Sequence, residues 1–234
     1  MNAQLKALID LQVVDSRIAA LEADVAKLPA EIAAVRAAVD EAGKVVAGIK
    51  GRIDVSRKSQ RAREKDLEDN RVKLQKFEGQ LYQVKTNKEY SAVLAEIEEV
   101  KQERSRIEDD ILTFMEAQDR LASELKDAEA HWREREGDGR REESALGERL
   151  RDVEIELARV RSERAELAGQ VPVAVLADYD KLLRHRTPAV VEVTRPNFCG
   201  GCHVTITPQR LQELRQQNAL IHCESCGRYL HWAA

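Results

Sequence analysis

The stretch Cys199-Gly-Gly-Cys202, followed after twenty residues by Cys223-Glu-Ser-Cys226, decides how the C-terminal part of this chain folds. These two C-x2-C pairs contain all four cysteines. Each pair turns tightly enough to aim both sulfurs at one point, and two pairs supply the tetrahedral thiolate set that Zn²⁺ prefers. We therefore predict one structural zinc ion, with Cys199, Cys202, Cys223 and Cys226 as its ligands. Four thiolates leave no open coordination position for water, so the site does not predict hydrolytic catalysis.

The residues around the cysteines have the pattern of a small zinc ribbon. β-Branched and aromatic runs at 189–194, 203–207, 219–222 and 228–232 predict strands, and a short helix is predicted at 208–217. A ribbon of this size has too small a core to fold unaided, so the metal is expected to stabilise it. We assign residues 189–234 to the C4-type zinc ribbon and 171–188 to a short connecting helix.

Residues 1–170 have the composition of a coiled coil. Charged residues make up 34% of the chain and aromatic residues only 4%. Apolar residues recur at alternating spacings of three and four from Ile18 to Ile53, and again from Tyr90 to Leu167. A period of 3.5 residues predicts a left-handed supercoil with a partner helix.

The two apolar stripes are separated by a break around residues 79–90. Thr86-Asn-Lys-Glu89 has the spacing of a capping box, which predicts the start of the second helix. Residues 44–88 hold 13 basic and 6 acidic side chains, whereas residues 96–129 hold 5 and 12. These stretches attract each other if the chain folds back on itself. The predicted fold is therefore mainly α: a long antiparallel coiled-coil hairpin over 1–170, with its tip near 82–86, followed by the small β zinc ribbon.

Two positions in the predicted helices weaken them. Pro29 removes one backbone hydrogen bond, and Gly137-Asp-Gly139 lowers helix propensity. A fold-back about residues 83–84 places these two positions opposite each other. A joint kink or hinge is predicted there.

Two groups of surface residues are candidates for binding. Basic side chains near the ribbon could contact phosphates, and Phe198, Tyr229 and Trp232 either stack on bases or form the ribbon's own core. The tip either binds a protein partner or uses its aromatic residues only to seal the end of the hairpin. The nucleic-acid candidates are Lys181, Arg184, Arg186, Arg195, Arg210, Arg215 and Arg228; the tip candidates are Tyr82, Lys85, Asn87, Lys88 and Tyr90.

Other function classes lack a sequence signal. The chain has no phosphate-cradling Gly-rich loop, nucleophile elbow or H-E-x-x-H motif, so we do not expect an enzyme. No apolar run reaches the roughly 18 residues of a membrane span, and the N-terminal residues do not resemble a signal peptide. We expect a cytoplasmic protein, a monomer or weak dimer, that does not contact membranes.

The chain resembles the bacterial family of coiled-coil proteins with a C-terminal C4-type zinc ribbon, often described as nucleic-acid-binding. The resemblance is most specific at Leu81-Tyr-Gln-Val-Lys-Thr-Asn-Lys-Glu-Tyr90, at Ala95-Glu-Ile97 and at the two cysteine pairs. It implies a helical hairpin with a zinc ribbon, RNA or DNA binding, and protein partners from transcription or secretion. The functional hypothesis is a non-catalytic regulatory adaptor whose ribbon binds nucleic acid, RNA more than DNA, while the rod engages a protein. The alternative is a protein–protein adaptor or spacer without nucleic-acid binding.

Overall fold

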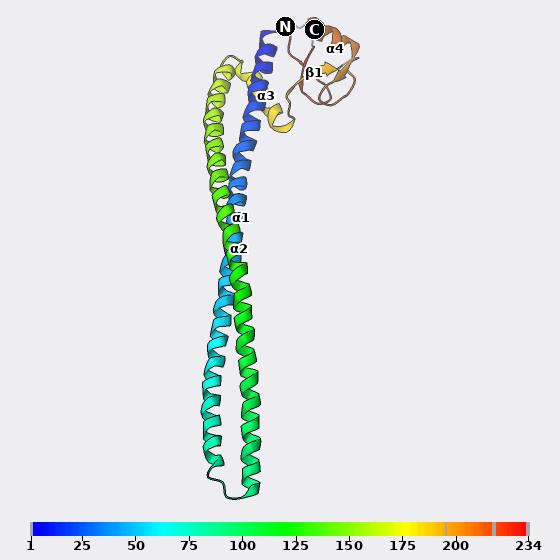
Figure 1. The fold of residues 1–234 in the computed structure, drawn as a ribbon. Helices are drawn as coiled ribbons and strands as arrows, with labels where there is room; N and C mark the ends of the chain where they lie inside the picture. Colours follow the sequence, from blue (N-terminus) through cyan, green and yellow to red (C-terminus); the bar gives the residue numbers. More distant parts are fainter. Residues whose placement is uncertain (1, 195, 217–218, 233–234) are drawn as a thin grey trace. The chain divides into compact units, whose positions relative to one another are not determined.

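The computed structural model describes residues 2–194, 196–216 and 219–232 (Figure 1). Two compact units divide the chain: residues 1–32 together with 144–234, and residues 33–143. The elements in chain order are α1 (Ala3–Leu81), α2 (Asn87–Ala168), α3 (Val173–His185), β1 (Val190–Thr194), β2 (Phe198–Cys199), α4 (Pro208–Gln216), β3 (Ile221–His222) and β4 (Tyr229–His231).

The unit 33–143 is a two-helix hairpin built from residues 33–81 of α1 and residues 87–143 of α2. Ile49 and Ile53 on α1 pack with Leu121 on α2 in one buried cluster. An ideal Cβ on Gly43 would lie 3.4 Å from the indole nitrogen of Trp132, so this glycine leaves room for the large ring. The apolar stripes predicted from the sequence therefore face each other across the hairpin.

Polar residues in the middle of this hairpin form hydrogen bonds across it. The Gln118 amide donates to Gln60 Oε1 at 2.7 Å, and the Ser56 hydroxyl donates to the Phe114 carbonyl at 3.4 Å. Asn70 is buried and donates to the Val100 carbonyl at 3.1 Å, while its Oδ1 has no hydrogen-bond partner among the described residues. The side chain of a buried asparagine finds hydrogen-bond partners in only a few alignments of two helices. Such residues therefore specify the register of the helices at some cost in stability. The polar stretch of α1 thus has partners within its own hairpin.

The connection between α1 and α2 has hydrogen bonds at both ends. Gln83 N–H donates to the Gln80 carbonyl at 2.8 Å. On the other side, Thr86 N–H donates to the Glu89 carboxylate at 3.2 Å, and Glu89 N–H donates to the Thr86 hydroxyl at 3.3 Å. These reciprocal bonds confirm the capping box.

The glycines at 137 and 139 lie elsewhere than predicted. A Cβ on Gly139 would lie 2.6 Å from Val39 Cγ2 and 3.6 Å from Val35 Cγ1, so this glycine faces a part of α1 beyond Pro29. Val35 is six residues after Pro29, about 9 Å along a helix. The expected alignment of Pro29 with Gly139 is wrong, because the pairing is shifted relative to a fold-back about residues 83–84. Both helices continue through these positions, and because Pro29 and Gly139 are not opposite each other, they do not support one joint kink.

The other unit joins both ends of the chain. The first turns of α1, the end of α2, α3 and one face of the ribbon enclose a common apolar core. Leu8, Leu11 and Tyr179 have no exposed surface in this core, and Tyr229 is 2% exposed. The ribbon is therefore packed on the helices of its own unit.

The ribbon contains a four-stranded sheet in the order β2-β1-β4-β3. β1 is antiparallel to β2 and parallel to β4, whereas β3 and β4 are antiparallel. The strand predicted at 203–207 is reduced to one bridge between Thr205 and Phe198. β2, which the sequence did not predict, takes the place beside β1. The pairing of Val193 with Cys199 and of Thr194 with Phe198 places the first cysteine directly beside β1.

Within the described residues, no helix is both long enough and apolar enough to cross a membrane.

Candidate metal centre

Two tight turns carry the cysteines. The first begins at Cys199 in β2, where Gly200 N–H donates to the Glu192 carbonyl at 3.0 Å. A Cβ on Gly200 would lie 2.4 Å from that carbonyl oxygen, so only glycine fits there. The second turn closes with a bond from Gly227 N–H to the Cys223 carbonyl at 2.7 Å, and Gly227 has a φ of +75° that favours glycine.

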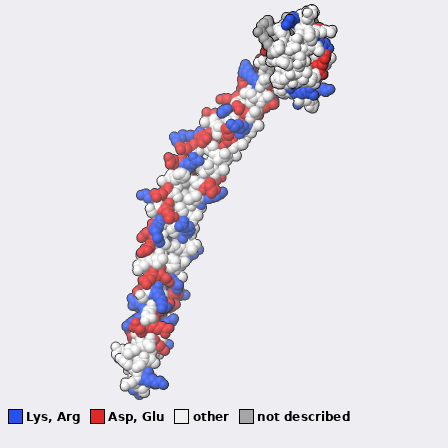
Figure 2. Space-filling model, turned by 90° about the vertical axis from the view of Figure 1, so that its right-hand side faces the viewer, with Lys and Arg blue, Asp and Glu red and all other residues white. Residues whose placement is uncertain are grey.

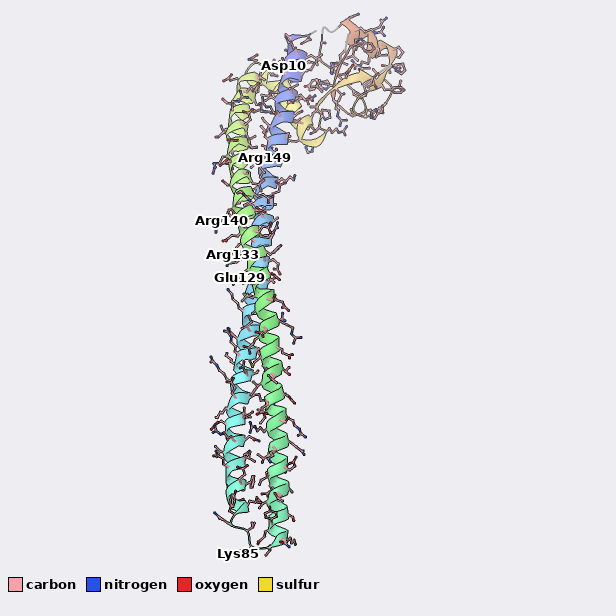
Figure 3. The ribbon with its side chains drawn as sticks, in the orientation of Figure 1. Asp10, Lys85, Glu129, Arg133, Arg140 and Arg149 are labelled. Carbon is pink, nitrogen blue, oxygen red and sulfur yellow. The ribbon has the colours of Figure 1, made fainter. Side chains whose placement is uncertain are left out.

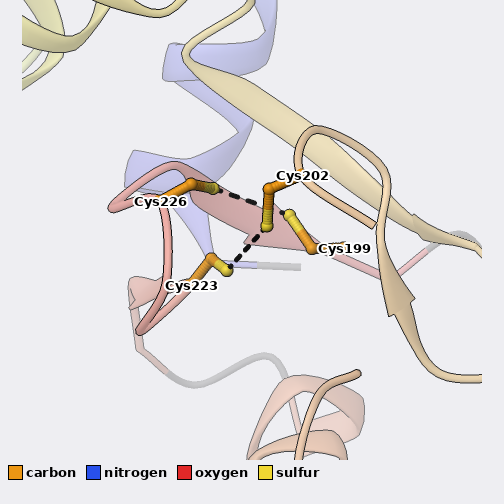
Figure 4. A group of neighbouring side chains, drawn as sticks. All are labelled: Cys199, Cys202, Cys223 and Cys226. Atoms are coloured by element: carbon orange, nitrogen blue, oxygen red, sulfur yellow. Dashed lines mark hydrogen bonds between the residues drawn. The ribbon is translucent and has the colours of Figure 1, made fainter. Parts of the chain in front are cut away.

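The turns bring the four sulfurs together (Figure 4). All four lie within 4.8 Å of one another; Cys199 Sγ is 3.8 Å from Cys226 Sγ, and Cys202 Sγ is 3.7 Å from Cys223 Sγ. A tetrahedron with Zn–S bonds of about 2.3 Å has sulfurs about 3.8 Å apart. The donor set therefore fits one structural zinc ion, held by Cys199, Cys202, Cys223 and Cys226.

The thiols differ in how readily they ionise. Burial raises the pKa of Cys199 to about 12 and also raises the pKa of Cys223. Burial acts on Cys226 in the same direction, but hydrogen bonds from the backbone and side chain of Arg228 outweigh it and lower its pKa to about 7. Thiolates bind zinc, so the bound cation must supply most of the charge compensation that the buried sulfurs lack.

Two arginines hold the second cysteine turn from outside. The Arg186 guanidinium donates to the Cys226 carbonyl at 2.6 Å. Arg228 Nε donates to the Pro188 carbonyl at 2.8 Å and to the Arg186 carbonyl at 3.3 Å. These bonds connect the segment after α3 to the metal-binding turn, so both side chains have a structural task.

A second polar cluster fixes the ribbon to the helices, and the sequence analysis missed it. The Gln12 side chain donates to the Val190 carbonyl at 2.9 Å and accepts from Val190 N–H at 2.6 Å. The Tyr229 hydroxyl donates to Asp178 at 2.8 Å. A single glutamine on a helix surface carries no pattern that would have identified this contact.

The same core buries a charged network around Asp15, which is 8% exposed. The Tyr179 hydroxyl donates to Asp15 Oδ2 at 2.8 Å, and Arg164 Nε donates to Asp15 Oδ1 at 2.5 Å. Arg164 also donates to Asp180 at 2.6 Å. Burial raises the pKa of Tyr179, and the hydrogen bond to Asp15 adds to the shift.

The predicted nucleic-acid candidates do not form one free basic surface. Arg210 is paired with Glu213 at 2.9 Å and with Glu224 at 3.2 Å. The Arg215 guanidinium lies 4.9 Å from the ring centre of Trp232. Lys181 and Arg184 are exposed on α3, whereas Arg195 lies outside the described residues. On the face shown in Figure 2, positive and negative side chains are interspersed.

The candidate residues of the tip are on the surface. Tyr82 is 90% exposed and Tyr90 is 46% exposed. Lys85, Asn87 and Lys88 are also exposed, and Figure 3 labels Lys85 on the connection between the helices. The interpretation that the tyrosines only seal the end of the hairpin is therefore weakened for Tyr82.

Comparisons with known proteins agree with this architecture. Residues 11–187 match the model of the CT398-like coiled coil hairpin domain, and residues 199–230 match that of the C4-type zinc ribbon domain. No curated protein gave a significant match.

Solved structures share the fold at low sequence identity. CT398 from Chlamydia trachomatis is 23% identical with a TM-score of 0.86, covering 98% of both chains. A protein from Mycobacterium smegmatis is 16% identical with a TM-score of 0.73, covering 97% of both. HP0958 from Helicobacter pylori is 17% identical with a TM-score of 0.64, covering all of this chain and 98% of the other.

These findings confirm the predicted helical hairpin, the C-terminal zinc ribbon and its single structural zinc. The chain therefore belongs to the family of proteins with a CT398-like coiled-coil hairpin domain, here followed by a C4-type zinc ribbon.

Proposed function

We propose that this protein is a non-catalytic adaptor whose hairpin tip docks a partner protein through Tyr82. The observation that carries the proposal is the 90% exposure of this tyrosine in the connection between two long helices. Tyrosine is enriched among the residues that dominate binding energy in protein interfaces, because it buries a large rigid ring and offers a hydroxyl. A side chain that only sealed the hairpin would be buried.

The backbone around Tyr82 supports a binding role. Hydrogen bonds at Gln83 and in the capping box of Thr86 and Glu89 hold both sides of the connection. A surface already in its bound conformation loses little entropy on association. Exposed Lys85 and Lys88 follow Tyr82 in the sequence, so an acidic partner surface fits this tip best.

The basic residues near the ribbon give less support to a nucleic-acid function. Phosphate binding depends on Lys and Arg side chains that neutralise phosphates and release the counterions of the nucleic acid. Arg210 is compensated by two carboxylates, and Arg186 and Arg228 are bonded to backbone carbonyls. RNA binding through the seven candidate residues stays a prediction, and the experiment below includes it as an outcome.

The test places a photo-crosslinking amino acid at position 82 of the full-length protein in cells of the source organism. A second protein carries it at Val72, which is 57% exposed on α1. We expect position 82, and not position 72, to capture one defined protein. The purified partner should then lose at least tenfold affinity with Tyr82→Ala and keep it with Val72→Ala.

Two results would overturn the proposal. The first is equal binding of the captured partner by Tyr82→Ala and the parent protein. The second is a position-82 crosslink that disappears after ribonuclease treatment, with salt-dependent binding of the purified protein to RNA. That second result would favour the nucleic-acid function instead.

A further inference from the structure

The ribbon has an open cavity beside the metal centre. Its volume is about 310 Å³, at the lower end of the range of ligand pockets. Val204, Thr205 and Ile206 line one side, and β3 with the second cysteine turn lines the other. Ile206 and Leu230, which are 6% and 1% exposed, give the cavity an apolar lining.

On the β3 side, the backbone of His222 is unpaired. β3 is at the edge of the sheet, and Cys223 N–H donates to the Arg228 carbonyl at 2.8 Å. Opposed residues in an antiparallel pair alternate between bonded and non-bonded positions. Because Cys223 is in a bonded position, His222, opposite Tyr229, is in a non-bonded one, and its N–H and C=O point away from β4.

On the opposite side, the backbone of Thr205 is unpaired for the same reason. The Val204 carbonyl accepts from Cys199 N–H at 3.0 Å, and Ile206 N–H donates to the Asn197 carbonyl at 2.7 Å. The intervening N–H and C=O of Thr205 therefore point away from β2. Within residues 2–194, 196–216 and 219–232, neither Thr205 nor His222 has a partner for these backbone groups.

The cavity carries no uncompensated positive charge. Arg210 and Glu224 are its only charged lining residues among those described, and they are paired with each other at 3.2 Å. Arg210 is also paired with Glu213 at 2.9 Å. A phosphate backbone has no complementary charge here, whereas an uncharged chain with alternating N–H and C=O groups complements the strand edges.

We propose that this cavity binds an extended segment of a partner protein, which adds a strand along the outward backbone of His222 on β3. Main-chain hydrogen bonds to an exposed edge give affinity, and a pocket for alternate side chains gives specificity. The segment has an apolar, small or β-branched side chain that enters over Ile206 and Leu230, and no charge in its pairing residues. This inference concerns the ribbon alone and does not rest on the proposal for the hairpin tip.

The test compares His222→Pro with His222→Ala in the full-length, zinc-loaded protein. Proline removes the outward N–H and is tolerated on an edge strand, whereas alanine keeps the N–H. Both variants lose the imidazole and its contact with the Gly227 carbonyl, so they differ in the backbone donor and in the proline ring that replaces it. Zinc content and, in a Trp132→Phe background, Trp232 emission verify that each variant has kept the ribbon fold.

The probe is a displayed library of random linear heptapeptides, panned on the parent protein and counter-selected on His222→Pro. We expect enriched uncharged, β-branched sequences. A synthetic peptide of that sequence should bind His222→Pro at least tenfold more weakly and His222→Ala within about threefold. Its binding should slow amide hydrogen exchange at His222, measured by NMR.

Three outcomes would overturn the inference. One is a library with no sequence enriched over the His222→Pro background. Another is a peptide that does not slow exchange at His222, or that binds both variants equally. The third is displacement of the peptide by polyuridylate at low salt together with direct binding of that RNA, which would assign the cavity to nucleic acid.

Discussion

Replacing Tyr179 with phenylalanine should destabilise the unit of residues 1–32 and 144–234 by about 1.5–2 kcal/mol. The ring is fully buried, so phenylalanine keeps its packing and removes only the hydroxyl that donates to Asp15 at 2.8 Å. A hydrogen bond to a charged group contributes about 1.5–3 kcal/mol. Asp15 keeps its bond to Arg164 in the variant, so the carboxylate is not left without a partner and the lower half of that range applies.

The assay is urea unfolding in zinc-containing buffer, followed by tryptophan emission. Trp232 packs against the ribbon core, whereas Trp132 lies beside Gly43 in the other unit. In a Trp132→Phe background the emission therefore reports on the ribbon and its unit. Tyr82→Phe is the matched control, because its hydroxyl is on the surface.

A loss of stability with Tyr179→Phe no larger than with Tyr82→Phe would refute the reasoning, because the buried bond would then contribute nothing. A loss well above 3 kcal/mol would also contradict it, since it would show that the ring itself had moved.

Three further predictions concern the hairpin, the metal and pH. Gly139→Ala should destabilise residues 33–143 in circular-dichroism melts, because its Cβ would lie 2.6 Å from Val39 Cγ2. Gly137→Ala, whose Cβ would have no atom within 4 Å, should instead stabilise them by about 0.5–1 kcal/mol. Stabilisation by both substitutions would contradict the contact of Gly139 with Val39. Chelation of zinc should abolish the Trp232 signal of the folded ribbon and leave most helical ellipticity intact; an unchanged signal would contradict the structural role of the metal. Burial and carboxylate partners raise the pKa of Tyr179 and Tyr229 above 10.0, so their contribution to stability is complete below pH 10 and is lost progressively as the pH rises above it. The urea midpoint should therefore fall as the pH rises above about 10, and a constant midpoint would refute this.

The sequence was sufficient for features that repeat or have fixed spacing. The heptad stripes predicted the two helices, Thr86 and Glu89 predicted the start of the second, and the cysteine spacing predicted one zinc ion. Each of these signals is local, because a helix period, a capping box and a C-x2-C turn all depend on residues close in the chain.

Features set by distant residues could not be predicted in this way. The register of the hairpin depends on side-chain contacts such as Gly43 with Trp132, and a count of arm lengths misplaces it. The pairing of Phe198 and Cys199 with β1 follows from ribbon topology, which no hydrophobic pattern encodes in two residues. The sequence placed Arg210 among the candidate phosphate-binding residues, but it could not show that Glu213 and Glu224 pair with it.

The bond between Gln12 and Val190 has a practical consequence for dissecting this protein. The first helical turns supply Leu5, Leu8 and Gln12 to the surface on which the ribbon is seated. A fragment that starts at residue 189 would expose Val190 and Tyr229 to water, even with its metal in place. Deleting the first turns of α1 therefore perturbs the ribbon, and a faithful minimal ribbon needs these turns as well as the C-terminal residues.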